Sequence, residues 1–375
     1  MGWSDLASGR FAIPRLVVAG GLLSVAFLGW ADNGTVTAPT LAVSTAAVSI
    51  APPSDPVSRG VGYDSARLER AIARVEALTP VSSLLVMQGG ELIVERYYRG
   101  MRAAMTTNMK SVSKTLLSPL VGIAIRDGLI EGPGQPLPEL LPAYYERLET
   151  RGGLDPRKRE LTLHHVLSMT TGIETTSFGN YGAWVSSPDW VWDQLRRPME
   201  CRPGCFEYST GNTHLLSAIL TERSGQSLRS YARDKFFGPV GIPLAEWDRD
   251  PQGRYLGGNN MALRSRDLLR FGEVFLAGGR WEGRQLVPEE WIRDSWRSNA
   301  RSPWNGHGYG YLWWVDRWGG ETAYFAWGYG GQYLVIVPSL DLIAVVTSSL
   351  ARTQGGHTRR LRDFFDEYLI PAFTD

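Results

Sequence analysis

Two side chains that could do chemistry together lie three residues apart, as Ser111 and Lys114. Apolar residues follow at close to helical spacing over 116–125, so the pair is predicted to open a buried helix that ends near Gly128. Residues three apart on a helix share a face. A serine hydroxyl becomes a nucleophile when a neighbouring base takes its proton, and a lysine becomes such a base when burial or a nearby cation lowers its pKa.

The spacing alone does not establish this chemistry. Serine and lysine are common, so most Ser-x-x-Lys matches in a chain of 375 residues arise by chance. The alternative is a capping Ser111 and a solvent-exposed Lys114. The neighbouring sequence favours a catalytic role for the pair. The motif opens an apolar helix, and it follows two β-rich runs, 82–88 and 91–98, that flank a Gly-Gly pair.

Two other segments carry groups that could act with this pair. Tyr208 stands just before an apolar stretch, and a tyrosine there can carry a proton if a nearby lysine lowers its pKa; ordinary packing is the alternative. The segment 326–332, Ala-Trp-Gly-Tyr-Gly-Gly-Gln, lies between two β-rich runs. Its glycines let a substrate approach the backbone, and one of its N–H groups could complete an oxyanion hole with that of Ser111; a plain hairpin turn is the alternative.

The chain has two cysteines, Cys201 and Cys205, with Pro-Gly between them. A tight turn there allows a disulfide, and two free thiols are the other interpretation. No histidine lies at ligand spacing from them, so no metal site is expected.

The charge and composition of the chain indicate which kinds of partner and which compartment to expect. The net charge of +1 gives no reason to expect nucleic acid. Residues 1–31 carry two arginines before an apolar run, 16–30, and then small residues, which predicts an export signal and a periplasmic or extracellular protein. An uncleaved anchor that tethers the chain to a membrane is the alternative. Residues 32–60 have the composition of a flexible linker.

Strand patterns occur early and late, with helical patterns between them. This order predicts an α/β (α+β) domain over 61–375. Its antiparallel sheet comes from about 61–105 and 300–375, is flanked by the N- and C-terminal helices, and receives a mostly helical insert, about 106–299. Within that insert, 173–193 contains Tyr181 and three tryptophans with little periodicity, as in a loop over a cleft.

Taken together, the motifs resemble those of the serine β-lactamase and penicillin-binding-protein superfamily, in its class C-like branch, which includes β-lactamase-fold esterases and 6-aminohexanoate-dimer hydrolases. The resemblance covers about 60–370. It depends on the order of Ser-Val-Ser-Lys, Leu-x-Leu-His-His-Val-Leu-Ser-Met-Thr-Thr-Gly, Phe-x-Tyr-Ser-Thr, Arg-Asp-Leu-Leu-Arg-Phe-Gly, Gly-Tyr-Gly-Tyr-x-Trp-Trp and Gly-Gly-Gln. No Gly-x-Ser-x-Gly elbow, phosphate loop or zinc-protease motif is present.

The resemblance implies roles for particular residues. Ser111 matches the acylated serine, Lys114 its base and Tyr208 the tyrosine of a Tyr-x-Asn motif. Tyr329 supplies the second oxyanion N–H beside that of Ser111. No metal or organic cofactor is expected. The substrate-binding positions are Thr210, Ala326, Trp327, Gly328 and Tyr181.

Two departures from the family pattern bear on the substrate. Thr210 replaces the asparagine of Tyr-x-Asn, and Ala326 replaces the lysine of Lys-Thr-Gly, which would pair with a substrate carboxylate. We therefore expect an exported serine hydrolase that cleaves an ester or amide bond of a small molecule. A β-lactamase or D-Ala-D-Ala carboxypeptidase is the alternative, and a non-turnover penicillin-binding or sensor protein is an alternative of another class.

Overall fold

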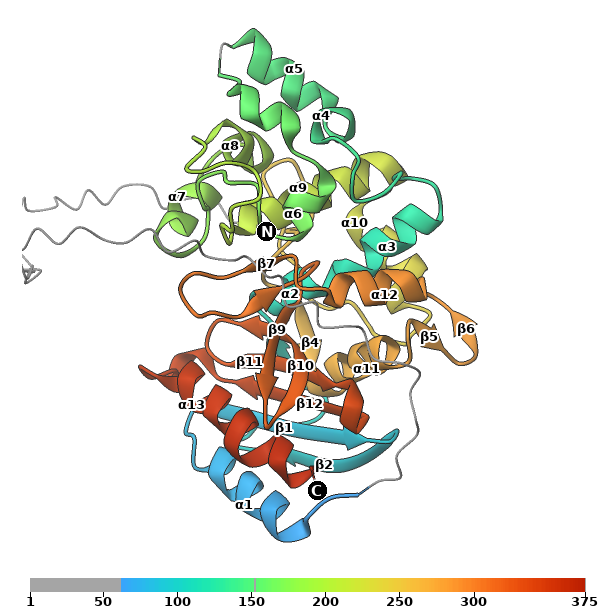
Figure 1. The fold of residues 1–375 in the computed structure, drawn as a ribbon, viewed down its shortest axis with the longest axis vertical. Helices are drawn as coiled ribbons and strands as arrows, with labels where there is room; N and C mark the ends of the chain where they lie inside the picture. Colours follow the sequence, from blue (N-terminus) through green and yellow to red (C-terminus); the bar gives the residue numbers. More distant parts are fainter. Residues whose placement is uncertain (1–61, 152, 375) are drawn as a thin grey trace, which may run out of the picture. The chain divides into compact units, whose positions relative to one another are not determined.

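The structure, a computed structural model, describes residues 62–151 and 153–374. Its largest sheet has eight strands in the order β2-β1-β12-β11-β10-β9-β8-β7, and every neighbouring pair is antiparallel (Figure 1). Early and late parts of the chain therefore share one sheet. Its strands are β1 (Val81–Gln88), β2 (Glu91–Tyr97), β7 (Ala300–Arg301), β8 (Gly308–Tyr309), β9 (Trp314–Trp318), β10 (Glu321–Gly328), β11 (Gln332–Val337) and β12 (Leu342–Ser348).

Helices cover both faces of the sheet centre, which explains why every residue of β11 and β12 is buried. On one face α11 (Ser265–Leu276) packs so closely that a Cβ atom on Gly272 would lie 2.9 Å from Ile343. On the other face, the ring of Phe365 lies 5.4 Å from that of Tyr333. Phe365 belongs to the π-helical extension of α13 (His357–Asp363), which packs with α1 (Ser65–Glu76). The predicted antiparallel sheet with flanking first and last helices is confirmed.

In the helical part, α9 (Thr210–Ser224) lies among the other helices (Figure 1). All its residues from Thr210 to Leu220 are buried, so this part of the helix has no solvent-facing side. The helices that pack against it are α3 (Ser118–Arg126), α6 (Leu163–Leu167), α8 (Trp190–Arg196) and α10 (Leu228–Ala232). Further elements of the chain are α4 (Leu137–Leu140), α5 (Pro142–Thr150), α7 (Tyr181–Val185), α12 (Glu289–Trp296) and the small hairpin of β5 (Arg280–Trp281) and β6 (Arg284–Gln285).

Two expected elements are divided in the structure. The helix expected after Ser111 is α2 (Val112–Leu116) followed by α3, with the break at Leu117. Pro119 lies in the first turn of α3, and a proline has no N–H to continue a helix through that point. The first of the late strand patterns, 308–315, forms two strands, β8 and β9, separated by a turn in which Leu312 has φ 68°.

A second, small sheet lies where the helical part meets the large sheet. It pairs β3 (Thr106–Asn108) with β4 (Ala262–Arg264). The Met109 N–H donates to the carbonyl of Met261, and the Met261 N–H donates to the Ser113 hydroxyl. These bonds fix the start of α2, and with it Ser111, against the loop 256–261.

No helix in the described ranges is both long and apolar enough to span a bilayer. The predicted signal or anchor, 1–31, and the linker, 32–60, lie outside those ranges.

Candidate active site

Ser111 is the N-cap residue of α2, at the end of the turn that follows β3. Lys110 just before it has φ 50°, a left-handed conformation that turns the chain sharply. Ser111 is half-buried, whereas all five residues of α2 are buried. The hydroxyl therefore stands at the edge of the core.

Lys114 is 1% exposed, and its ammonium donates three hydrogen bonds. The acceptors are Ser111 Oγ at 3.2 Å, Thr210 Oγ1 at 3.0 Å and the Gly258 carbonyl at 2.7 Å. None of them is a carboxylate. Burial lowers the pKa of Lys114 to about 7. Burial alone produces this shift, so the second cation considered from the sequence is not required.

Thr210 was predicted to contact substrate, but its hydroxyl faces the amine of Lys114. It is 3% exposed, and its Oγ1 lies 2.9 Å from Ser177 Oγ while it accepts from Lys114. The Thr210 N–H also donates to Ser177 Oγ at 2.9 Å. Thr210 therefore orients Lys114, and Ser177 in turn orients Thr210.

The Gly258 carbonyl is a contact that the sequence did not indicate. A Cβ on Gly258 would lie 1.9 Å from Thr213 Oγ1, and one on Gly257 would lie 2.1 Å from the Thr213 carbonyl. Two glycines are thus what lets this loop touch α9 and reach Lys114. The Gly-Gly pair in the sequence was the available signal.

Tyr208 is 8% exposed, and its ring centroid lies 5.1 Å from the Lys114 ammonium. Burial raises its pKa, although its hydrogen bond with Ser111 acts in the opposite direction. The proton-carrying role expected of Tyr208 depended on a Tyr208 pKa lowered by a neighbouring lysine. That condition is wrong, because burial dominates and Lys114 lies over the ring face. Tyr208 is a neutral phenol beside the serine hydroxyl.

The end of β10 lies directly against the chain that leads into Ser111. A Cβ on Gly328 would be 2.4 Å from the Met109 carbonyl and 3.3 Å from Lys110 Cβ. The sequence assigned this glycine to close approach by a substrate, whereas at Gly328 the close neighbour is the protein's own backbone. Tyr329 follows and is 72% exposed. Among the described residues, the N–H groups of Ser111 and Tyr329 have no acceptor, as an oxyanion hole requires.

The strand position that carries a lysine in the family motif offers no charge here. Ala326 is fully buried in β10, and Trp327 next to it is half-buried with its ring stacked on Tyr333. The nearby Lys110 ammonium donates to Asn260 Oδ1 at 3.1 Å.

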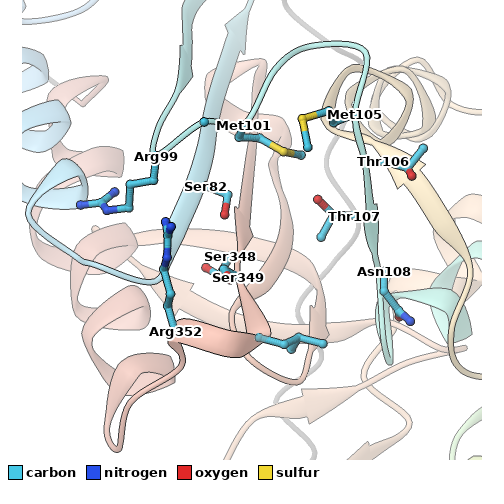
Figure 2. A pocket seen from close by; sticks show the side chains of 12 residues that line it. Ser82, Arg99, Met101, Met105, Thr106, Thr107, Asn108, Ser348, Ser349 and Arg352 are labelled. Atoms are coloured by element: carbon cyan, nitrogen blue, oxygen red, sulfur yellow. The ribbon is translucent and has the colours of Figure 1, made fainter.

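A cavity of about 360 Å³ lies at the same end of the sheet, between the β3 segment and the chain after β12 (Figure 2). Arg99 and Arg352 line one side, and Met105 and Thr107 line the other. The candidate catalytic residues do not line it. This hollow is therefore separate from the site at Ser111.

Tyr181 lies on α7, where its ring packs 5.9 Å from that of Trp184. Burial raises its pKa, and a hydrogen bond with Asn259 opposes that rise. Asn259 adjoins Gly258, whereas no hydrogen bond or ring contact among the described residues joins the Tyr181 side chain to Ser111. The substrate contact expected for Tyr181 stays a prediction.

Cys201 and Cys205 form a disulfide that closes the turn shortly before Tyr208. The turn is pinned on both sides, since Gly204 N–H donates to the Thr170 carbonyl and Glu207 N–H donates to that of Met169. Elsewhere in 62–151 and 153–374, no three His, Cys, Asp or Glu side chains are grouped so as to hold a metal.

An antiparallel sheet, a helical insert and a Ser-x-x-Lys pair at their junction define the class of β-lactamases and penicillin-binding proteins. The family described as Beta-lactamase matches residues 68–365, and the chain belongs to this family. The resemblance found in the sequence is thereby confirmed.

Relatives with hydrolase names support this assignment. A 6-aminohexanoate-dimer hydrolase from Paenarthrobacter ureafaciens is 26% identical over 328 residues, covering 81% of this chain and 82% of that protein. A Bacillus anthracis structure described as a candidate 6-aminohexanoate-dimer hydrolase has TM-score 0.65 at 20% identity, over 79% of this chain and 80% of that one. A Streptomyces D-stereospecific amidohydrolase has TM-score 0.61 at 15% identity, over 80% and 98%. The two structures establish the shared fold.

Proposed function

We propose that the chain is a serine hydrolase that cleaves an ester or amide bond through an acyl-enzyme on Ser111. The observation that carries this proposal is Lys114. Its amine is buried among neutral oxygen atoms, 3.2 Å from Ser111 Oγ, with a pKa of about 7. A base poised near neutral pH is what the activation of a serine requires.

The hydrogen-bond partners of Lys114 determine the direction in which the lone pair of its neutral amine points. A neutral amine has two N–H groups and one lone pair. The Gly258 carbonyl can only accept a hydrogen bond, and the Thr210 hydroxyl accepts the second. The lone pair that remains is directed at Ser111 Oγ, from which it takes the proton.

The remaining steps follow from the neighbours of Ser111. Its Oγ attacks the substrate carbonyl carbon, and the resulting oxyanion accepts from the N–H groups of Ser111 and Tyr329. As the carbonyl–leaving-group bond breaks, the neutral Tyr208 hydroxyl gives its proton to the leaving oxygen or nitrogen and takes up the proton held by Lys114 in the same step, so that no tyrosinate has to form. Water then gives a proton to the Lys114 amine and attacks the acyl carbon, the bond from that carbon to Ser111 Oγ breaks, and Oγ regains the proton from Lys114 as the acid product leaves.

We further propose that the substrate is a neutral, short-chain ester or a linear amide rather than a β-lactam. Ala326 is fully buried and Thr210 faces the base, so the strand supplies neither the cation nor the amide of the family motifs. A charge-assisted hydrogen bond to a carboxylate contributes roughly 1.5–3 kcal/mol. The proteins similar to this chain include a 6-aminohexanoate-dimer hydrolase and a D-stereospecific amidohydrolase, which supports the same choice.

The test compares kcat/KM for p-nitrophenyl butyrate and nitrocefin on the full chain. We expect the ester to be the better substrate and Ser111→Ala to abolish its hydrolysis. A fluorophosphonate label should map to Ser111 by peptide mass spectrometry. A label on Ser113 or Ser118 would contradict the nucleophile assignment. Faster nitrocefin turnover would replace esterase with β-lactamase, and acylation without turnover would indicate a sensor.

We also propose that the protein is exported, with its N-terminal segment as signal or membrane anchor. The Cys201–Cys205 disulfide supports an oxidising compartment. Cell fractionation tests this, and retention of the full chain in the cytoplasm would contradict it.

A further inference from the structure

Two of the most exposed large apolar side chains of the described residues stand together beside the candidate active site. Phe178 is 67% exposed and Trp304 is 48% exposed. Phe178 follows Ser177 in the helical part, whereas Trp304 lies in the loop between β7 and β8. Their ring centroids are 5.9 Å apart at an interplanar angle of 85°. Segments far apart in sequence thus bring two rings into edge-to-face contact at the surface.

Both exposed rings also contact Tyr208. The centroid of Tyr208 lies 6.2 Å from that of Phe178 and 6.4 Å from that of Trp304. Trp327, on the end of β10, lies 6.3 Å from Trp304. These rings form a wall that runs from the surface to the hydroxyl that faces Ser111.

Folding alone does not account for this exposure. Burial of an aromatic ring stabilises a folded protein, and the exposed rings of Phe178 and Trp304 contribute only part of that stabilisation. Phe178 in addition has φ 53°, an uncommon conformation for a residue with a bulky side chain. The adjoining Ser177 is bonded to Thr210, so the Phe178 backbone is held in register with the Lys114 network.

We propose that Phe178, Trp304 and Trp327 form an aromatic subsite for the leaving group, and that the substrates are esters or amides with a flat, neutral, apolar leaving group. This inference rests on the proposed function. Tyr208 hands the proton to the leaving group, so that group must approach Tyr208 and touch the rings packed around it. The ammonium of Lys110, next to Ser111 in the chain, disfavours a cationic group there.

The test separates ring recognition from chemical reactivity. It compares acetate esters of 2-naphthol and hexafluoroisopropanol, two alcohols of similar acidity and the same acyl group. We expect kcat/KM for the naphthyl ester to be higher by about tenfold or more. Trp304→Ala and Phe178→Ala should each remove most of that preference, because each lowers kcat/KM for the naphthyl ester more than kcat/KM for the hexafluoroisopropyl ester.

Conservative and remote variants complete the design. Trp304→Phe should retain most of the preference and Trp304→Leu should not, because only the former keeps an aromatic ring. Leu92→Ala is the matched control, since Leu92 is an exposed apolar residue on β2, far along the sheet order from β10. A naphthyl preference that survives both alanine variants, or that falls equally in Leu92→Ala, overturns the subsite and leaves the hydrolase proposal standing.

Binding of 2-naphthol to Ser111→Ala, measured by calorimetry against cyclohexanol, does not depend on turnover. We expect naphthol to bind more tightly and Trp304→Ala to abolish the difference. If that holds while no ester is cleaved by the unmutated chain, the hydrolase proposal fails and the aromatic subsite stands. Equal binding of the two alcohols overturns the subsite.

Discussion

Three oxygen atoms surround the amine of Lys114, and none of them carries a negative charge. An opposite charge would hold the lysine protonated, and a protonated lysine cannot take a proton from serine. The absence of a carboxylate in this group is therefore as informative as the hydrogen bonds themselves. It links the burial of one side chain to the pH range in which the site can react.

The first prediction at this scale is a pH profile. The uncharged amine is the active form, so kcat/KM on p-nitrophenyl butyrate should rise with pH and level off, with an apparent pKa near 7. Thr210→Asp should move this limb to higher pH, because a carboxylate favours the ammonium, whereas Thr210→Ser should leave it in place. A profile that is flat from pH 5 to 9 would contradict the assignment of Lys114 as base.

The second concerns stability. The pKa of Lys114 falls from 10.5 to about 7 on folding, so the folded state disfavours the ammonium by roughly 4–5 kcal/mol. Lys114→Met removes this penalty but leaves the Gly258 carbonyl without its donor. We expect a net gain in the free energy of unfolding at pH 7, with activity lost.

The sign of the pH dependence provides the check. Below pH 7 Lys114 is protonated in both the folded and the unfolded chain, so the full cost of burying its ammonium lowers the free energy of unfolding. Between pH 7 and 10.5 Lys114 is protonated only in the unfolded chain, so the unmutated protein gains stability as the pH rises. The advantage of Lys114→Met in urea titrations should therefore shrink from pH 7 to pH 10. An advantage that grows over this range would contradict the shift.

At the scale of elements, the loop 256–261 supports the site. His214 on α9 accepts the Gly257 N–H at Nδ1, so its Nε2 carries hydrogen and donates to Asp250 Oδ2 at 2.9 Å. Both side chains are fully buried. This pair holds the loop so that the Gly258 carbonyl meets Lys114.

The third prediction tests that loop. Gly258→Ala places a Cβ 1.9 Å from Thr213 Oγ1, so the carbonyl must move away from Lys114. We expect kcat to fall by about ten- to a hundredfold, the scale for a misplaced general base. The double variant Gly258→Ala/Thr213→Ala should recover part of the lost kcat, because it removes the Thr213 hydroxyl that the added Cβ would meet. Gly134→Ala is the control, because no atom lies within 4 Å of its added Cβ. Equal losses in both single variants would refute the role of the loop.

Much of the fold was predictable, because strand and helix periodicities extend over whole elements. Ser111, Lys114 and Tyr208 were predicted as a group because each belongs to a motif. Ser177, Gly258 and Trp304 were not, since each lies in a loop whose position depends on packing with distant segments. Pro119 was visible in the sequence, yet the apolar pattern continues through it, and the break in the helix was missed.

For the molecule as a whole, the fourth prediction concerns the disulfide. The bond between Cys201 and Cys205 closes a short loop, for which chain entropy predicts about 2 kcal/mol of stabilisation. Reduction with dithiothreitol should lower the free energy of unfolding by about that amount. The Cys201→Ser/Cys205→Ser double variant should match the reduced protein and be insensitive to dithiothreitol. A reductant effect on the double variant would assign the loss to another cause.

The strand pairing also determines how long β1 must wait for its second partner strand while the chain is being synthesised. β1 pairs on one side with β2, but its other partner is β12, and Val81 meets Ser348 across that pair. At about 5–20 residues per second, a ribosome needs roughly 10–50 s to make the chain between them. For that interval a nascent chain presents an open, apolar strand edge and has neither the β10 turn nor Tyr329 beside Ser111. The proposed catalysis must therefore wait until β10, β11 and β12 have been made, and a chaperone has that interval in which to bind the open edge.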